Sequence, residues 1–229
     1  MKANDSQQLQ SKAPVSSDSA FDQQMGGKTM SPPKFGLEAS GGEAAHAADG
    51  GGQMPDDEFE ALFWKIVAKG QDEKGHPIKD EKTQFQYLAN AACFVMDNYG
   101  WNRDLIRVRV LEKTKRSWGE TFGNNGKEEI QRIYFPKLLF RQDFGLIVRT
   151  IGHEYQHAMD ATSDNPSGNI YESEFRAYYW ELMSKDVIAH RDPKNVKIAK
   201  ANAIQAYEYM NTDKKKLYLD KYNEILSMK

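Results

Sequence analysis

The sequence predicts an α+β domain: two helices, then a small antiparallel or mixed sheet with an edge hairpin, then a helical C-terminal part. Before residue 100 and again from about residue 142, apolar residues recur with the 3.6-residue period of a helix. Between these segments, apolar and polar residues alternate as they do in half-buried strands. Helices and strands that come in separate blocks along a chain are typical of the α+β class.

The first two helices are predicted from their apolar spacing and from the residues that begin and end them. Asp56 or Asp57 can cap the first helix, and Gly70 ends it. The second helix covers residues 81–98 and stops at the glycine that follows. The folded domain is therefore expected to span residues 55–229.

The sheet is predicted from three short segments. Residues 106–110 alternate strictly between apolar and basic side chains, and residues 118–122 and 130–135 flank a Gly-Asn-Asn-Gly turn that indicates a hairpin. Pro136 ends the last strand, and its missing N–H predicts a position at a sheet edge. The remaining helices are expected over residues 142–161, 171–188 and, in one or two pieces, after Pro193.

Composition narrows the classes of function. A net charge of −2 and a pI of about 6.2 give no general affinity for nucleic acid, and no apolar run is long enough for a membrane span. Cys93 is the only cysteine, which excludes an internal disulfide and a cluster of thiolate ligands. Residues 1–54 are polar and rich in Ser and Gly, with few aromatic side chains, so we expect a disordered tail.

One segment carries the residues of a metal centre. His153 and His157 are four residues apart on a predicted helix, so both imidazoles project from one face and can reach the same Zn²⁺. Glu154 is rotated by about 100° from His153 and can instead accept a proton from water that the metal activates. The pattern predicts a zinc hydrolase in which Glu154 is the general base.

A catalytic zinc usually has three protein ligands, so a third ligand must lie downstream. Continuation of the motif as HExxHxxGxxH is excluded, because the positions of its glycine and its last histidine hold Asp and Ser. Three carboxylates remain as candidates: Asp164, Glu172 and Glu174. Asp164 lies among turn-forming residues, and Glu172 at a helix start can simply interact with the helix dipole. Glu174 is favoured, because Ala177 on the same helix face would permit close approach of the two helices.

The segment His153-Glu154-Tyr155-Gln156-His157, followed by Glu174-Phe175-Arg176-Ala177, resembles the zincin metallopeptidases of the gluzincin type. The resemblance covers about residues 128–185. It implies a zincin-like fold, protein or peptide substrates, zinc ligands His153, His157 and Glu174, and Glu154 as the base. The short spacing between His157 and Glu174 is more similar to compact bacterial zincins than to the large thermolysin-like enzymes.

A second resemblance concerns the tail. Its segment Ser31-Pro32-Pro33-Lys34-Phe35-Gly36-Leu37 is similar to leaders of bacterial proteins associated with extracellular contractile injection systems and related toxins. The N-terminus also lacks the apolar core of a secretory signal peptide. The resemblance therefore implies an effector or toxin made in the bacterial cytoplasm and exported or loaded into an injection particle. An extended linker with two incidental apolar residues is the alternative interpretation.

Three interpretations of the domain stay open. The first is a zinc peptidase that holds extended substrate along residues 133–135 as an edge strand. The second is a catalytically silent zincin-like binding or structural module, and the third is a zinc hydrolase that acts on a non-peptide amide. The candidate donors to a transition-state oxyanion are Tyr178 and His190, followed by Tyr171, Arg176 and Tyr179.

Overall fold

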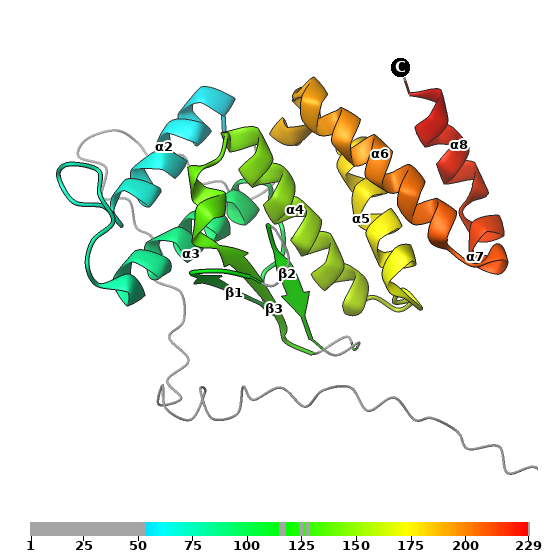
Figure 1. The fold of residues 1–229 in the computed structure, drawn as a ribbon, viewed down its shortest axis with the longest axis horizontal. Coiled ribbons are helices and arrows are strands. Elements are labelled where there is room, and N and C mark those ends of the chain that lie inside the picture. The colour runs from blue at the N-terminus through cyan, green and yellow to red at the C-terminus, as the bar shows by residue number, and fades with distance from the viewer. Residues whose placement is uncertain (1–53, 115–117, 124–125, 127–128, 229) are drawn as a thin grey trace, which may run out of the picture. The chain divides into compact units, whose positions relative to one another are not determined.

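The computed structural model describes residues 54–114, 118–123, 126 and 129–228, and the predicted tail of residues 1–54 lies outside them except for its last residue. The described part contains helices and one small sheet, which confirms the α+β class and the predicted order of helices and strands (Figure 1). From Pro193 onward the described residues form three helices, where one or two were predicted. The helices are α2 (Asp56–Ala68), α3 (Glu81–Asn98), α4 (Phe144–Ala161), α5 (Ile170–Met183), α6 (Pro193–Tyr209), α7 (Thr212–Leu217) and α8 (Leu219–Ser227), with short 3-10 helices η1 (Lys137–Arg141) and η2 (Ile188–Arg191). The strands are β1 (Ile106–Leu111), β2 (Glu120–Phe122) and β3 (Gln131–Pro136).

The sheet is mixed, and its strand order is β1-β3-β2. Strand β3 pairs in parallel with β1, where Ile133 lies opposite Val108, and antiparallel with β2, where Ile133 lies opposite Thr121. The antiparallel pairing predicted for the hairpin is therefore confirmed, while the central residues of its predicted turn, 124–125, lie outside the described residues. The edge position predicted for β3 is wrong, because β3 is the central strand. Pro136 is tolerated there because it is the last residue of the strand. Strand β2 is the sheet edge beside α4.

One hydrophobic core joins α2, α3, the sheet and α4. Phe63 of α2, Val95 of α3, Phe135 of β3 and Ile151 of α4 are all fully buried within it. Each fully buried side chain of this size contributes about 1.5–3 kcal/mol relative to leaving it in water. This core fixes the buried face of α4, and the opposite face is left to carry polar residues.

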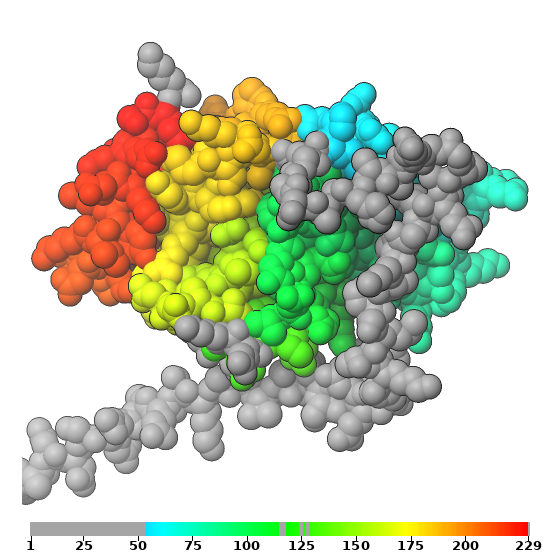
Figure 2. All heavy atoms as spheres, turned by 180° about the vertical axis from the view of Figure 1, so that it is seen from behind, coloured from blue at the N-terminus to red at the C-terminus, as the bar shows by residue number. Residues whose placement is uncertain are grey.

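A second core lies among α5, α6 and α8, where Phe175, Ala203 and Ile225 are buried. Helix α4 lies between the sheet and α5 in Figure 1, and the view from behind in Figure 2 shows yellow α5 between the green elements and the red C-terminal helices. Gly152 lets α5 approach α4, because a Cβ at this position would come within 2.6 Å of the Trp180 ring. The two histidines of α4 thereby face α5 across a short distance.

The ends of α4 and α5 are set by polar side chains. Asp143 accepts a hydrogen bond from the N–H of Leu146 at 2.8 Å and caps α4. The helix therefore begins at Phe144, two residues after the predicted start at residue 142. Asn169 caps α5 in the same way. Helix α5 ends at Met183 instead of residue 188, because the chain turns at Ser184, whose hydroxyl bonds back to the carbonyl of Trp180. No helix in the described part of the chain has the length and apolar character that a membrane crossing requires.

Candidate metal centre

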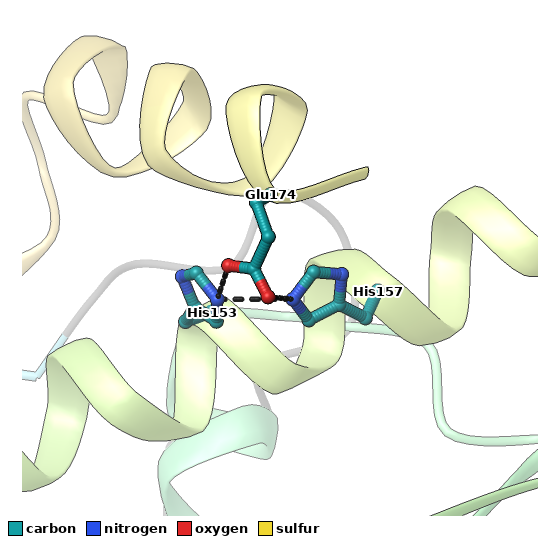
Figure 3. A group of neighbouring side chains, drawn as sticks. All are labelled: His153, His157 and Glu174. Atoms are coloured by element: carbon teal, nitrogen blue, oxygen red, sulfur yellow. Dashed lines mark hydrogen bonds and ion pairs between the residues drawn. The ribbon is translucent and has the colours of Figure 1, made fainter. Parts of the chain in front are cut away.

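Helix α4 presents His153 and His157 on one face, and α5 brings the carboxylate of Glu174 up to both of them (Figure 3). The two Nε2 atoms are 2.9 Å apart. Glu174 Oε2 lies 3.2 Å from Nε2 of His153, and Oε1 lies 3.7 Å from Nε2 of His157. Among the described residues, this is the one group of three or more His, Cys, Asp or Glu side chains whose ligand atoms all lie within 4.8 Å of one another.

The donor set and its spacing fit a catalytic zinc ion. Tetrahedral zinc with ligand bonds of about 2.0–2.1 Å has neighbouring ligand atoms about 3.3 Å apart, and the three separations lie on either side of this value. Two histidines and a glutamate are a ligand set that catalytic zinc sites use. The side chains of His153, His157 and Glu174 are 12%, 16% and 24% exposed, so the group remains open on one side.

The outer ring nitrogens of both histidines are held by neighbouring side chains of α5. His153 Nδ1 lies 2.7 Å from Glu181 Oε1, and His157 Nδ1 lies 2.8 Å from the hydroxyl of Ser173. An imidazole that donates from Nδ1 to a carboxylate presents the lone pair of Nε2 to a metal, and its ring cannot rotate freely. The α5 helix therefore orients both predicted histidine ligands as well as supplying Glu174.

The electrostatics of the site favour a cation between these groups. Burial disfavours the charged imidazolium of His153, but hydrogen bonds to Glu174 and Glu181 outweigh burial and raise its pKa to about 10. A metal ion at this position would displace the proton from Nε2 and take its place among the same carboxylates. Burial, together with the charges of Glu174 and Glu181, also raises the pKa of Tyr178 to about 12, so this hydroxyl stays protonated at neutral pH.

Glu154 reaches the same region from α4 but is held by the sheet. Its side chain is buried, and its Oε2 accepts a hydrogen bond of 2.7 Å from the hydroxyl of Thr121 on β2. The same hydroxyl lies 3.1 Å from the main-chain carbonyl of Glu154. Gly119 leaves room for the carboxylate, since a Cβ there would lie 2.7 Å from Glu154 Oε1. Strand β2 therefore fixes the position of the predicted general base.

A cleft of about 610 Å³ runs between residues 118–123, helix α4 and the start of α5. It is lined by His153, His157, Glu174 and Glu154, so the predicted ligands and the predicted base open into one space. This volume is within the range of small-molecule and peptide sites. No protein-family model, curated protein or solved structure matches this chain.

The two alternative ligands lie elsewhere. Asp164 is exposed in the loop between α4 and α5. Glu172 is fully buried, and its carboxylate is bound by Arg176 at 3.0 Å, Lys214 at 2.7 Å and the Tyr218 hydroxyl at 2.8 Å. These partners come from α5 and from the C-terminal helices, so Glu172 serves a separate ion network and Glu174 alone joins the histidines.

Of the five candidate oxyanion donors, one lines the cleft and four lie elsewhere. Tyr178 is the one that lines the cleft, and its ring centre lies 4.5 Å from that of His153. His190 lines a different, small cavity whose walls come from α4, α5, η2 and α6. The other three have partners outside the cleft: Tyr171 stacks on Tyr209, Arg176 binds Glu172, and Tyr179 donates to Glu224.

Four residues of the site were missed by the sequence reasoning: Gly119, Thr121, Ser173 and Glu181. Glu181 is seven residues after Glu174, so helical periodicity alone places both on one face of α5 and could have indicated it. Thr121 gave no local signal, because its contact with Glu154 depends on how β2 packs against α4.

Proposed function

We propose that this chain is a zinc-dependent metallopeptidase with a zincin-like fold that hydrolyses peptide bonds. The observation that carries the proposal is the convergence of His153, His157 and Glu174 in a cleft that also contains the oriented carboxylate of Glu154. Two imidazoles, one carboxylate ligand and a second carboxylate that can act as a base are the groups that this chemistry needs.

Each group has a distinct role in the proposed reaction. Zinc, when bound, supplies Lewis-acid polarisation of the substrate carbonyl and acidifies water. Glu154 accepts the proton of the attacking water and can pass it to the leaving amine. Thr121 keeps the Glu154 carboxylate in one orientation, and Glu181 and Ser173 keep the histidine rings in theirs.

Substrate binding is assigned to strand β2 in place of β3. In the described sheet β2 pairs with β3 only, and residues 118–123 form one wall of the cleft. An extended peptide could add to this edge with main-chain hydrogen bonds, which bind a backbone without selecting its side chains. Exposed apolar side chains at the cleft, Phe122 on β2 and Ile170 on α5, offer contacts for the side chains of such a peptide.

The first test is metal content. Purified full-length protein should contain zinc near one equivalent per chain, and a His153→Ala/His157→Ala variant should lose it. Protein that binds no zinc in the absence of chelators would refute the proposal at its first step.

The second test separates a peptidase from a catalytically silent module with the same site. Glu154→Gln should retain zinc and lose hydrolysis of a peptide library that the wild type cleaves. If wild type and variant both hold zinc and neither cleaves any peptide, the peptidase proposal fails. The chain is then a binding or structural module, or it hydrolyses a non-peptide amide, and assays with non-peptide amide substrates distinguish these two.

The tail is a separate proposal: residues 1–54 act as an address for an export or injection apparatus. The support is compositional, namely a polar segment interrupted by one short Pro-Pro-x-Phe-x-Leu element. Deletion of residues 1–54 should leave zinc content and the melting temperature unchanged and should abolish loading or export. Unfolding or zinc loss on deletion would place the tail in the fold and remove this support.

A further inference from the structure

Arg149 lies on α4 one turn before His153 and lines the same cleft. Its side chain is 12% exposed, so most of it is removed from water. Within the described residues its ion pair is with Glu181, at 3.6 Å between Nη1 and Oε2, which is too long for a good hydrogen bond. Its Nε atom is buried and has no hydrogen-bond partner there.

A guanidinium with so few partners is unusual at this depth. It carries five N–H donors, and a buried charge is costly unless it is paired and hydrogen-bonded. Glu181 satisfies it only in part, because Oε1 is 2.7 Å from Nδ1 of His153 and Oε2, which is also buried without a hydrogen-bond partner, stays 3.6 Å from Nη1. The Arg149 donors therefore have capacity for a further acceptor.

Arg149 lies where these hydrogen-bond donors could contact a substrate bound in the cleft. It is the one Arg or Lys side chain among the described residues that line the cleft. Residues four apart on a helix have Cβ atoms about 5–6 Å apart, so the guanidinium lies close to the His153 end of the metal centre. One residue of an extended peptide spans about 3.3 Å, so a side chain that reaches Arg149 belongs to a residue directly beside the bond held at the metal.

We propose that Arg149 binds a carboxylate of the substrate and gives the enzyme a preference for an acidic residue next to the cleaved bond. This inference rests on the proposed function, because it names the substrate class of the same cleft. The planar fork of arginine matches a carboxylate with two parallel hydrogen bonds, which makes it selective against a neutral amide of the same shape. The carboxylate can come from an Asp or Glu side chain or from the end of the peptide chain.

The first experiment measures cleavage preference with the zinc-loaded full-length protein. A peptide library with amidated C-termini is digested, and the cleaved bonds are identified by mass spectrometry. Asp and Glu should be enriched at one position flanking the cleaved bond. For matched peptides that differ by Glu or Gln at that position, kcat/KM should be about 10- to 100-fold higher for Glu, as expected for hydrogen bonds to a charged group.

Variants of Arg149 assign the preference to this side chain. In Arg149→Gln the ratio of kcat/KM for the Glu peptide to kcat/KM for the Gln peptide should fall to about one, whatever the absolute rates. Arg149→Lys should keep part of this ratio, because lysine keeps the positive charge but lacks the planar guanidinium. Digestion of the same peptides with free C-termini tests whether the carboxylate comes from an Asp or Glu side chain or from the end of the peptide chain. Cleavage that requires a free terminus and removes the last residue would still place a carboxylate on Arg149 and would assign it to the chain end.

A binding measurement keeps this inference distinct from the proposed function. Peptides are captured from the same library on immobilised, zinc-loaded Glu154→Gln protein, and the affinities of matched Glu and Gln forms are compared by calorimetry with and without Arg149→Gln. If nothing is hydrolysed but the Glu form still binds more tightly through Arg149, the peptidase proposal fails and the carboxylate site stands. Hydrolysis with no Glu preference, or a preference that survives Arg149→Gln, overturns the carboxylate site alone. Loss of zinc from Arg149→Gln also overturns it, because Arg149 would then act by supporting Glu181 and His153.

Discussion

Glu172 provides the sharpest stability test, because its carboxylate is fully buried at the start of α5. Oε1 accepts hydrogen bonds from the Tyr218 hydroxyl at 2.8 Å and from Arg176 at 3.0 Å. Oε2 accepts the N–H of Gly168 at 2.9 Å and lies 2.7 Å from Lys214 Nζ. These bonds join the loop before α5, α5 itself and α7, so we predict that Glu172→Gln destabilises the C-terminal half of the domain.

The size of the expected loss in the free energy of unfolding follows from the pKa of the Glu172 carboxyl group. Burial opposes ionisation of Glu172, but hydrogen bonds from Lys214, Gly168 and Tyr218, with the charge of Arg176, outweigh it and lower the pKa from 4.5 to about 2. Each pKa unit corresponds to about 1.4 kcal/mol, so the full shift would be worth about 3 kcal/mol. The side chains of Lys214 and Arg176 are 32% and 23% exposed, so solvent screening reduces the expected loss in Glu172→Gln to about 1–3 kcal/mol at pH 7.

The assay is urea denaturation of metal-free wild type and Glu172→Gln between pH 7 and pH 3, with Glu208→Gln on the exposed surface of α6 as a matched control. A folded-state pKa below the unfolded value stabilises the fold fully above pH 4.5, and this stabilisation is lost as the pH falls toward 2. The difference between wild type and Glu172→Gln should therefore shrink below pH 4.5, and Glu208→Gln should show little difference at any pH. Equal stability of Glu172→Gln and wild type at pH 7, or a gap that widens in acid, would refute the reasoning.

Three predictions concern the proposed catalytic groups. Gly119→Ala places a Cβ within 2.7 Å of Glu154 Oε1, so kcat should fall by about 10- to 100-fold while zinc stays near one equivalent; an unchanged kcat would show that the carboxylate can move at no cost. Thr121→Val removes the hydroxyl bonded to Glu154 and should lower kcat by about tenfold with KM nearly constant, whereas Thr121→Ser should retain most activity; equal losses would indicate a packing role. Glu181→Gln weakens the support of His153 and should lower zinc affinity by about 10- to 100-fold in a chelator competition, and an unaltered affinity would remove Glu181 from the metal centre.

The helices and the HExxH motif of residues 153–157 could be predicted from the sequence, because both depend on residues that are close together along the chain. Residues 81–98 were predicted as a helix and form α3 with these bounds, and His153 and His157 share a helix face because their spacing requires it. Strand pairing depends on residues distant in sequence, and the local absence of an N–H in Pro136 led to an incorrect edge position for β3. For the same reason the contact between Thr121 and Glu154, 33 residues apart, could not be predicted.

The choice of Glu174 over Glu172 shows how periodicity on α5 connects the metal centre to the rest of the domain. Glu174, Tyr178 and Glu181 recur at helical spacing and face α4, where they hold or contact His153. Glu172 and Arg176 recur at the same spacing on another face and bind the C-terminal helices. One helix therefore positions the proposed third ligand with one face and anchors itself with the other. A change that loosens the Glu172 network should consequently weaken zinc binding as well as the fold, although Glu172 itself does not join the metal-ligand group.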